Sequence, residues 1–239
     1  MDVKVAIPTH WRSDMIEEKT LFLLRNLWLD ITIFANPFWE ARKYEEVLWD
    51  KYKIVEIEEF TTMWKLRNDI LDYYEDWDKI LMIDDDVKII YKLVAKHKAL
   101  HITDKELLET IEKWFWLCEA SWYKLRWIYP SNSRLCMSNT IWYNKFIVGT
   151  MMWIIKTDLR FDPKINNKED YDFTLQNIQR FGWTIRLNDI AASNCYWKTK
   201  WWLQDAPRTQ TRDILRLKAK RWDKITIRAD KEWEILLNT

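Results

Sequence analysis

Ile80-Leu-Met-Ile-Asp-Asp-Asp-Val-Lys88 is the stretch from which the fold and the function of this sequence can both be approached. Four consecutive apolar residues predict a strand that is buried on both faces, as in a parallel sheet. Asp84, Asp85 and Asp86 would follow at the carboxyl end of that strand, where open α/β sheets bind ligands. Adjacent carboxylates repel one another, and a divalent cation would relieve the repulsion. If the strand continues, Asp84 and Asp86 share one side; an acidic loop that merely caps the strand is the alternative.

Strand and helix patterns alternate on both sides of this stretch. Apolar runs at Val3–Ile7, Ile31–Ala35 and Lys53–Glu56 predict three earlier strands, and the segments between strands have helical spacing. This alternation predicts βαβ units and an α/β fold with a mostly parallel sheet flanked by helices. No linker divides residues 1–239, so we expect one domain, in which about 1–100 alternates regularly between strands and helices and about 101–239 is less regular. In the second half we expect a helix opened by Thr103 or Asp104, strands in Phe146–Ile155 and at Thr184–Leu187, and a helix at Glu169–Phe181.

The composition excludes several classes of protein. With 239 residues, 48% hydrophobic and 31% charged, the chain is neither disordered nor membrane-embedded, and no signal peptide is recognisable at its start. Cys118, Cys136 and Cys195 show no zinc spacing, so we expect reduced thiols and a cytoplasmic location.

Charge is unevenly distributed along the chain. Residues 40–86 carry 15 acids and 7 bases, whereas residues 198–228 carry 10 bases and 3 acids. The basic segment is either a solvated helix face or an anion site for a diphosphate or a nucleic-acid backbone.

Four motifs in order resemble the GT-A nucleotide-sugar glycosyltransferases. They are Ile7-Pro-Thr-His-Trp-Arg12, Lys65-Leu-Arg-Asn-Asp69, the triple Asp, and Lys168-Glu-Asp-Tyr-Asp-Phe173. Within that fold, these motifs together with Phe161-Asp162 and Asn194-Cys-Tyr196 are similar to the base-J-type and phage DNA glucosyltransferases, which act on a hydroxymethylated pyrimidine in DNA.

The resemblance implies a role for each matching residue. Asp86 and Asp84 would bind Mn²⁺ or Mg²⁺, and Asp170, with Glu169 next, would be the general base that deprotonates the acceptor hydroxyl. The resemblance makes about 1–100 the donor-binding half and about 101–239 the acceptor-side half. The donor, most simply a UDP-hexose, would be surrounded by Thr9, Arg12, Arg67, Asp69, Asp84 and Asp85. Diphosphate or DNA phosphate contacts would fall to Lys198, Lys200 and Arg208. Family members often supply a late histidine to the metal, but His10, His97 and His101 all lie early, which leaves Asn194 as a weak third ligand.

Other functions compete with this interpretation. The favoured acceptor is a hydroxymethylated base in DNA, and a glycan or small-molecule acceptor is the alternative. A haloacid-dehalogenase-type phosphatase also places Asp-x-Asp after a buried strand, but normally after the first strand. A DNA-binding module without enzymatic activity is favoured only by the basic segment.

The counts of glycine and tryptophan are abnormal. The chain has 2 Gly and 18 Trp, whereas average usage would give about 17 Gly in a chain of this length. Several tryptophans follow a predicted helix and precede a predicted strand, where a left-handed glycine is usual; they are Trp28, Trp49, Trp77, Trp183 and Trp222. We therefore hypothesise that most are glycines whose reassigned UGA codon was translated as tryptophan, with consequences at Trp11 and at Trp201-Trp202. The alternative is a Trp-rich protein that uses aromatic rings to grip bases or sugars, and Trp233, inside a strand-like run, is compatible with it.

Overall fold

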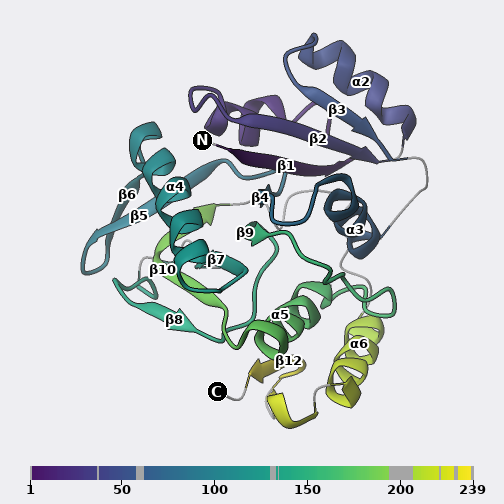
Figure 1. The fold of residues 1–239 in the computed structure, drawn as a ribbon, viewed down its shortest axis with the longest axis vertical. Helices are drawn as coiled ribbons and strands as arrows, with labels where there is room; N and C mark the ends of the chain where they lie inside the picture. The colour runs from purple at the N-terminus through teal and green to yellow at the C-terminus, as the bar shows by residue number, and fades with distance from the viewer. Residues whose placement is uncertain are drawn as a thin grey trace.

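A block of four parallel strands forms the N-terminal half of the central sheet (Figure 1). β1 (Val3–His10) lies between β2 (Asp30–Asn36) and β4 (Lys79–Ile83), and β3 (Lys53–Glu56) pairs with β2. These are the four strands that the sequence predicts. The apolar runs of β2 and β4 suit strands that are covered on both faces, whereas β3 lies at the edge of the sheet and is exposed at both ends.

Beyond β4 the sheet is mixed. β9 (Met151–Ile155) runs antiparallel to both β4 and β7 (Leu125–Tyr129), and β10 (Ile185–Ser193) is parallel to β7. The structure is a computed structural model. It describes residues 2–36, 38–57, 62–129, 133, 135–193, 207–220, 222–228 and 231–237. The strand order is β3-β2-β1-β4-β9-β7-β10-β5-β6, and the remaining members are β5 (Ile89–Ala95), β6 (Lys98–His101) and β8 (Ile141–Tyr143), which pairs with β10. The predicted α/β class is confirmed.

Helices cover both faces of the sheet because side chains alternate along the buried strands. On β4, Leu81 and Ile83 pack in one core cluster, and Ile80 and Met82 pack in the other. The first cluster is covered by α1 (Phe22–Leu24), α2 (Phe38–Leu48) and α4 (Asp104–Ala120). The second is covered by α3 (Met63–Tyr73) and α5 (Glu169–Phe181). α4 begins at the predicted place, with a capping box between Thr103 and Glu106.

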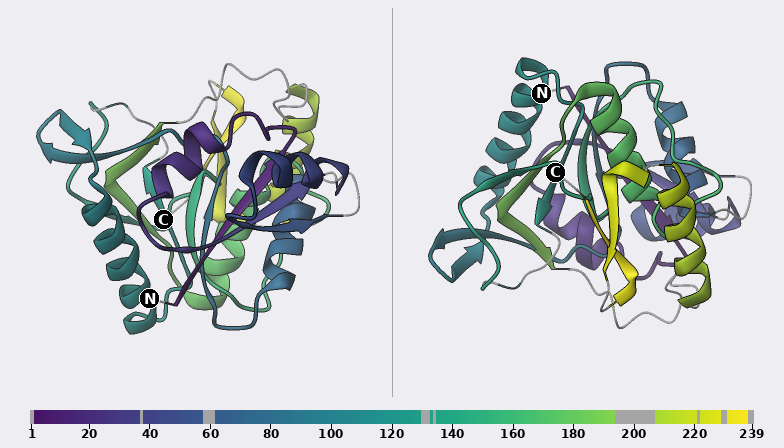
Figure 2. Two further views of the ribbon diagram at one scale, coloured as in Figure 1. Left: turned by 90° about the horizontal axis from the view of Figure 1, so that it is seen from above. Right: turned by 90° about the horizontal axis from the view of Figure 1, so that it is seen from below.

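The C-terminal segment packs against α5 (Figure 2). α6 (Pro207–Lys220) is followed by a hairpin of β11 (Ile225–Arg228) and β12 (Lys231–Leu237). Ile214 and Leu217 of α6 share a small core with Leu175 of α5. No helix in the described ranges is long and apolar enough to cross a bilayer.

Left-handed backbone occurs at most of the predicted tryptophan turns. Trp28, Trp49 and Trp77 have φ values of 51°, 48° and 76°, as the sequence predicts. The prediction for Trp183 is wrong by one residue, because Gly182 itself closes α5 with φ 87° and donates its N–H to the carbonyl of Ile178. Trp222 lies in a short 3₁₀ turn, Trp222–Lys224, rather than at a left-handed helix end.

Candidate active site

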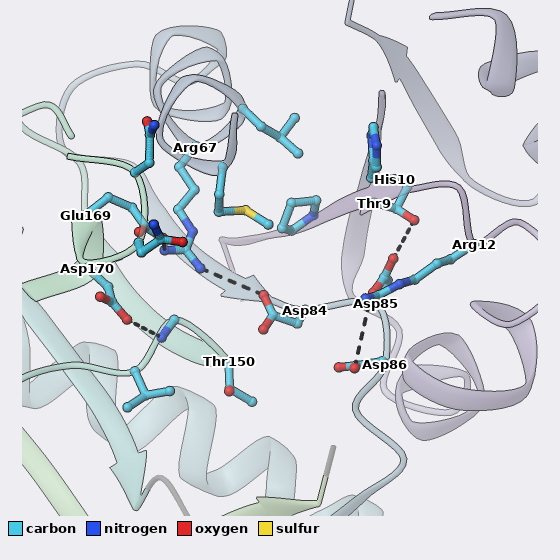
Figure 3. Close-up of a pocket in the computed structure, with 17 residues that line it drawn as sticks. Thr9, His10, Arg12, Arg67, Asp84, Asp85, Asp86, Thr150, Glu169 and Asp170 are labelled. Atoms are coloured by element: carbon cyan, nitrogen blue, oxygen red, sulfur yellow. Dashed lines mark hydrogen bonds and ion pairs between the residues drawn. The ribbon is translucent and has the colours of Figure 1, made fainter. Parts of the chain in front are cut away.

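A pocket opens at the carboxyl edge of β1 and β4 (Figure 3). β9 runs antiparallel to β4, so the segment that enters β9 reaches the same edge, and the N–H of Asp84 donates to the carbonyl of Thr150 at 2.9 Å. α3 and the start of α5 close the remaining sides. The lining residues are Pro8, Thr9, His10, Arg12, Met63, Leu66, Arg67, Asp84, Asp85, Asp86, Val148, Gly149, Thr150, Asn166, Asn167, Glu169 and Asp170.

The triple Asp forms a turn after β4 instead of continuing the strand. β4 ends at Ile83, so strand alternation does not govern the three carboxylates, which all line the pocket. Thr20 holds the turn from within the core: its hydroxyl donates to the carbonyl of Asp84 at 2.7 Å and accepts from the N–H of Val87 at 3.0 Å. The buried position of Thr20 thereby sets where the carboxylates lie.

Asp85 is engaged inside the protein. Its Oδ2 accepts the Thr9 hydroxyl at 2.7 Å and its Oδ1 accepts Nη1 of Arg12 at 2.6 Å. Tyr44 of α2 completes this group, 2.6 Å from the Thr9 hydroxyl and accepting the N–H of Arg12 at 3.1 Å. The resemblance assigns Thr9 and Asp85 to donor contact. In the structure their polar atoms instead form hydrogen bonds that join the end of β1 and the loop after it to the turn after β4.

Asp84 and Asp86 retain weaker ion pairs. Asp86 lies 3.6 Å from Nη1 of Arg12, and Asp84 lies 4.0 Å from Nη2 of Arg67. Burial raises the pKa of Asp84 to about 7, opposed by the charge of Arg67, and burial with the charge of Asp85 raises the pKa of Asp86. Two carboxylates held close together in this way fit a Mn²⁺ or Mg²⁺ ion, which would favour their charged forms.

Within the described part of the chain no group of three or more His, Cys, Asp or Glu side chains has the arrangement of a complete metal site. Asp84 and Asp86 would leave coordination positions for diphosphate oxygens or water. Asn194, the weak third candidate, lies outside the described residues, as does Cys195.

Glu169 and Asp170 face the triple Asp across the pocket, with Arg67 between them (Figure 3). Nη1 of the buried Arg67 donates to Oε1 of Glu169 at 2.7 Å. Asp170 accepts the N–H of Gly149 at 3.2 Å and its neighbour Tyr171's N–H at 2.8 Å. Burial raises the pKa of both carboxyl groups, and Arg67 opposes this in each case.

Gly149 is required at its position by the packing of Arg67. A Cβ atom at residue 149 would lie 1.9 Å from Nη2 of Arg67. The absence of a side chain therefore lets the guanidinium cross the strand-entry segment and reach both Asp84 and Glu169. Gly149, Asn166, Asn167 and Tyr44 were not anticipated from the sequence; only the two asparagines, directly upstream of the acidic motif, carried a usable signal.

Some predicted residues lie away from the pocket. Asp69 does not line it, because its carboxylate pairs with Lys65 one helical turn earlier, at 2.9 Å. Lys198 and Lys200 lie outside the described residues, and the side chain of Arg208 does too. The triple Asp, Thr9, Arg12, Arg67 and the Glu169-Asp170 pair are brought together.

Comparisons with known proteins give a fold and no family. A scan against protein-family models finds no match, and a search of curated proteins finds none either. Among solved structures, S. aureus TarS matches with a TM-score of 0.55 at 15% identity, over 92% of this chain and 39% of that chain. GalNAc-T7, solved with UDP, GalNAc and Mn²⁺, matches with a TM-score of 0.56 at 10% identity, over 94% of this chain and 48% of that chain. The chain thus spans less than half the length of either structure.

These matches show that the fold is GT-A-like, as the resemblance implies. The narrower resemblance to DNA glucosyltransferases gains no support from them.

Proposed function

We propose that this protein is a metal-dependent glycosyltransferase that moves a hexose from a nucleotide diphosphate to an acceptor hydroxyl. The observation that carries the proposal is one pocket, in a GT-A-like fold, with Asp84 and Asp86 on one wall and Glu169 and Asp170 on another. The match to GalNAc-T7 with bound UDP, GalNAc and Mn²⁺ supports UDP-hexose and Mn²⁺ as first candidates. Both halves of residues 1–239 contribute to the pocket, which supports treating them as one unit.

The donor would bind along the carboxyl edge of β1 and β4. Asp86 and Asp84 would hold the cation, which neutralises the charge that develops on the departing diphosphate. Arg12, held by Asp85 at 2.6 Å, would keep the loop after β1 in place beside the diphosphate. Arg67 would place a fixed positive charge between the donor side and the acidic pair.

Asp170 is the better placed general base of the acidic pair. The carboxylate of Glu169 accepts a hydrogen bond from Arg67 at 2.7 Å, whereas that of Asp170 accepts the main-chain N–H groups of Gly149 and Tyr171. Burial raises the pKa of Asp170, which makes it a stronger base than an exposed carboxylate. The acceptor oxygen would attack the anomeric carbon and lose its proton to Asp170, while the bond to the diphosphate oxygen breaks with its electron pair on the diphosphate. This displacement inverts the configuration at the anomeric carbon, so the anomeric configuration of the product tests it.

A glycan or small-molecule acceptor is favoured over DNA by the pairing of α6. Lys220 bonds to Asp162 and to Asp172, the latter at 2.9 Å, and Arg216 lies 3.6 Å from Asp213. These basic side chains hold the protein together, so the net charge of residues 198–228 overstates what is offered to a phosphate backbone.

A donor–acceptor matrix tests the proposal. UDP-glucose, UDP-galactose, UDP-GlcNAc and UDP-GalNAc, each with Mn²⁺ or Mg²⁺, are offered to simple sugars, glycans, plain DNA and hydroxymethylated DNA. We expect metal-dependent transfer or donor hydrolysis that Asp170→Asn abolishes. Asp72→Asn is the matched control, because this exposed carboxylate pairs with Arg160 away from the pocket. The proposal is refuted if no donor–acceptor pair gives either donor hydrolysis or transfer. Transfer only to hydroxymethylated DNA would restore the DNA acceptor.

A further inference from the structure

Asn166 and Asn167 form a corner of the pocket wall beside the acidic pair. The main-chain N–H groups of both residues donate to the same atom, Oδ2 of Asp213, at 2.9 Å each. Asp213 belongs to α6, is fully buried and does not line the pocket. A carboxylate that accepts two neighbouring N–H groups fixes the backbone of that corner.

The contacts with Asp213 use the main chain of Asn167 and leave its side-chain amide unused. Nδ2 of Asn167 is buried, and no hydrogen-bond partner for it occurs among the residues that the structure describes. A buried donor without a partner is costly, so an oxygen atom of a bound molecule is its natural complement.

The charges around Asn167 select the kind of oxygen. Glu169 and Asp170 lie two and three residues further along the same wall, and a phosphate there would meet like charge. A hydroxyl group is neutral, accepts from an amide and can donate to a carboxylate. A sugar hydroxyl therefore fits this corner better than a phosphate does.

We propose that the Asn167 amide, whose Nδ2 is shielded from solvent in this structure, turns toward the pocket when the donor binds and donates from Nδ2 to a hydroxyl of the donor's sugar. Asp213 is then the positioning residue that holds the backbone of Asn167. This rests on the proposed function, because it assumes a nucleotide-sugar donor. α6 is anchored independently of Asp213, since Lys220 bonds to Asp162 and Asp172 on either side of the corner. Loss of the Asp213 carboxylate should therefore loosen the corner without releasing the helix.

The test compares a nucleoside diphosphate with its sugar conjugates. Affinities for UDP and for the four UDP-hexoses, all with Mn²⁺, are measured by calorimetry for wild type and variants. Asn167→Ala should weaken the productive UDP-hexose about 5- to 10-fold, the range of one lost hydrogen bond, and leave UDP unchanged. Asp213→Ala should likewise weaken binding of the UDP-hexose and leave UDP binding unchanged. Asp213→Asn, which keeps one acceptor oxygen, should lose less affinity for the UDP-hexose than Asp213→Ala.

Asp72→Asn is the matched control, because Asp72 pairs with Arg160 outside the pocket and takes no part in anchoring α6. Equal losses for UDP and UDP-hexose, or no loss in Asn167→Ala, would overturn the assignment. Wild type that binds no nucleotide at all would instead count against the proposed function. If Asp213→Ala does not fold, Asn167→Ala still decides the sugar contact, and Asp213→Asn decides positioning.

A separate observation concerns the left-handed residues. Of the eight described non-glycine residues with positive φ, Asp50, His97 and Asn144 belong to types that tolerate this conformation. The other five are all tryptophan, for which positive φ is strained; they are Trp11, Trp28, Trp49, Trp77 and Trp122. Their side chains are largely exposed, from 39% at Trp11 to 98% at Trp28, so packing does not compensate.

We infer that these five positions are glycine in the working protein, encoded by a UGA codon that its source reads as glycine. Gly182, with φ 87°, shows a true glycine in the same role at the end of α5. The consequence for the site falls on Trp11, which lies between the pocket-lining His10 and Arg12 and stacks its indole edge-on to His10 at 6.0 Å. A glycine there would let phosphate oxygens approach the loop's backbone.

The nucleotide sequence of the gene tests the inference directly. UGA at codons 11, 28, 49, 77 and 122 is expected, and UGG at these codons would overturn it whatever the protein's function. For the site, Trp11→Gly should bind UDP with Mn²⁺ several-fold more tightly than the chain as written. Unchanged or weaker UDP binding would overturn the part that concerns the donor loop.

Discussion

Glycine at the exposed left-handed tryptophans should stabilise the fold. The perturbation is the triple change Trp28→Gly, Trp49→Gly and Trp122→Gly. These side chains are 98%, 78% and 78% exposed, so removing them costs almost no packing. Trp77 is left out, because its ring lies 4.9 Å from the ammonium group of Lys124 and would lose that cation–π contact.

The magnitude follows from two opposing terms. A left-handed conformation costs an L-residue about 1–2 kcal/mol, which glycine avoids. Glycine also loses more backbone entropy on folding, which takes back about 0.5–1 kcal/mol. The net gain is about 0.5–1 kcal/mol at each position. If the three changes act independently, they add to about 1.5–3 kcal/mol, or about 3–12 °C in Tm.

Thermal and urea unfolding followed by circular dichroism measure this gain. Trp28→Ala is the first control, because it removes the same indole but keeps a Cβ at positive φ, and should gain nothing. Trp116→Gly is the second: Trp116 is 64% exposed inside α4, where glycine should destabilise by about 0.5 kcal/mol. An equal gain for Trp28→Ala and Trp28→Gly would refute the backbone explanation, and a loss in the triple variant would refute the whole idea.

Other predictions concern the site. Asp86→Asn should reduce transfer at least 100-fold, and excess chelator should do the same to wild type; full activity in chelator would rule out the metal. Because burial raises the pKa of Asp84 to about 7, its proton must leave before a cation binds, so Mn²⁺ affinity should rise from pH 5.5 to 7.5 and level off above. In the metal-free protein the same raised pKa makes the folded state lose stability as pH rises from about 4 to 7, and Asp84→Asn should reduce this dependence in a pH series of unfolding curves by the share that Asp84 contributes. Gly149→Ala should cost both stability and transfer, since its Cβ would displace Arg67; wild-type behaviour would show that the guanidinium moves aside freely. If DNA is the acceptor, binding in gel shifts should weaken steeply with salt, and a flat response would leave a glycan or small molecule.

Much of the donor side of the site could be predicted from the sequence. Apolar runs at Val3–Ile7 and Ile80–Ile83 predict buried strands of one mostly parallel sheet, and parallel strands bring their carboxyl ends to one edge. The structure makes these two strands neighbours, so Thr9, Arg12 and the triple Asp meet at that edge. The tryptophan turns are a similarly local matter, because helix ends demand particular backbone angles.

Only the tertiary structure decided how those residues divide their work. Asp85 faces Thr9 and Arg12, and Asp69 pairs with Lys65 outside the pocket, although sequence spacing treats these carboxylates as equivalent to their neighbours. The Arg12–Asp85 pair joins side chains 73 residues apart, which no local pattern encodes, whereas the i, i+4 spacing of Lys65 and Asp69 is itself a local pattern that permits their pair.

The acidic pair, Glu169 and Asp170, lies on a helix that the local sequence predicts, but its position in the pocket depends on residues far away in the sequence. The helix Glu169–Phe181 follows from its spacing and its N-terminal acids. Its position opposite the triple Asp depends on β9 running antiparallel beside β4, on Gly149 leaving room for Arg67, and on Asp213 of α6 holding Asn166 and Asn167. Sequence periodicity reports which face of an element is buried, whereas packing alone determines which distant element buries it.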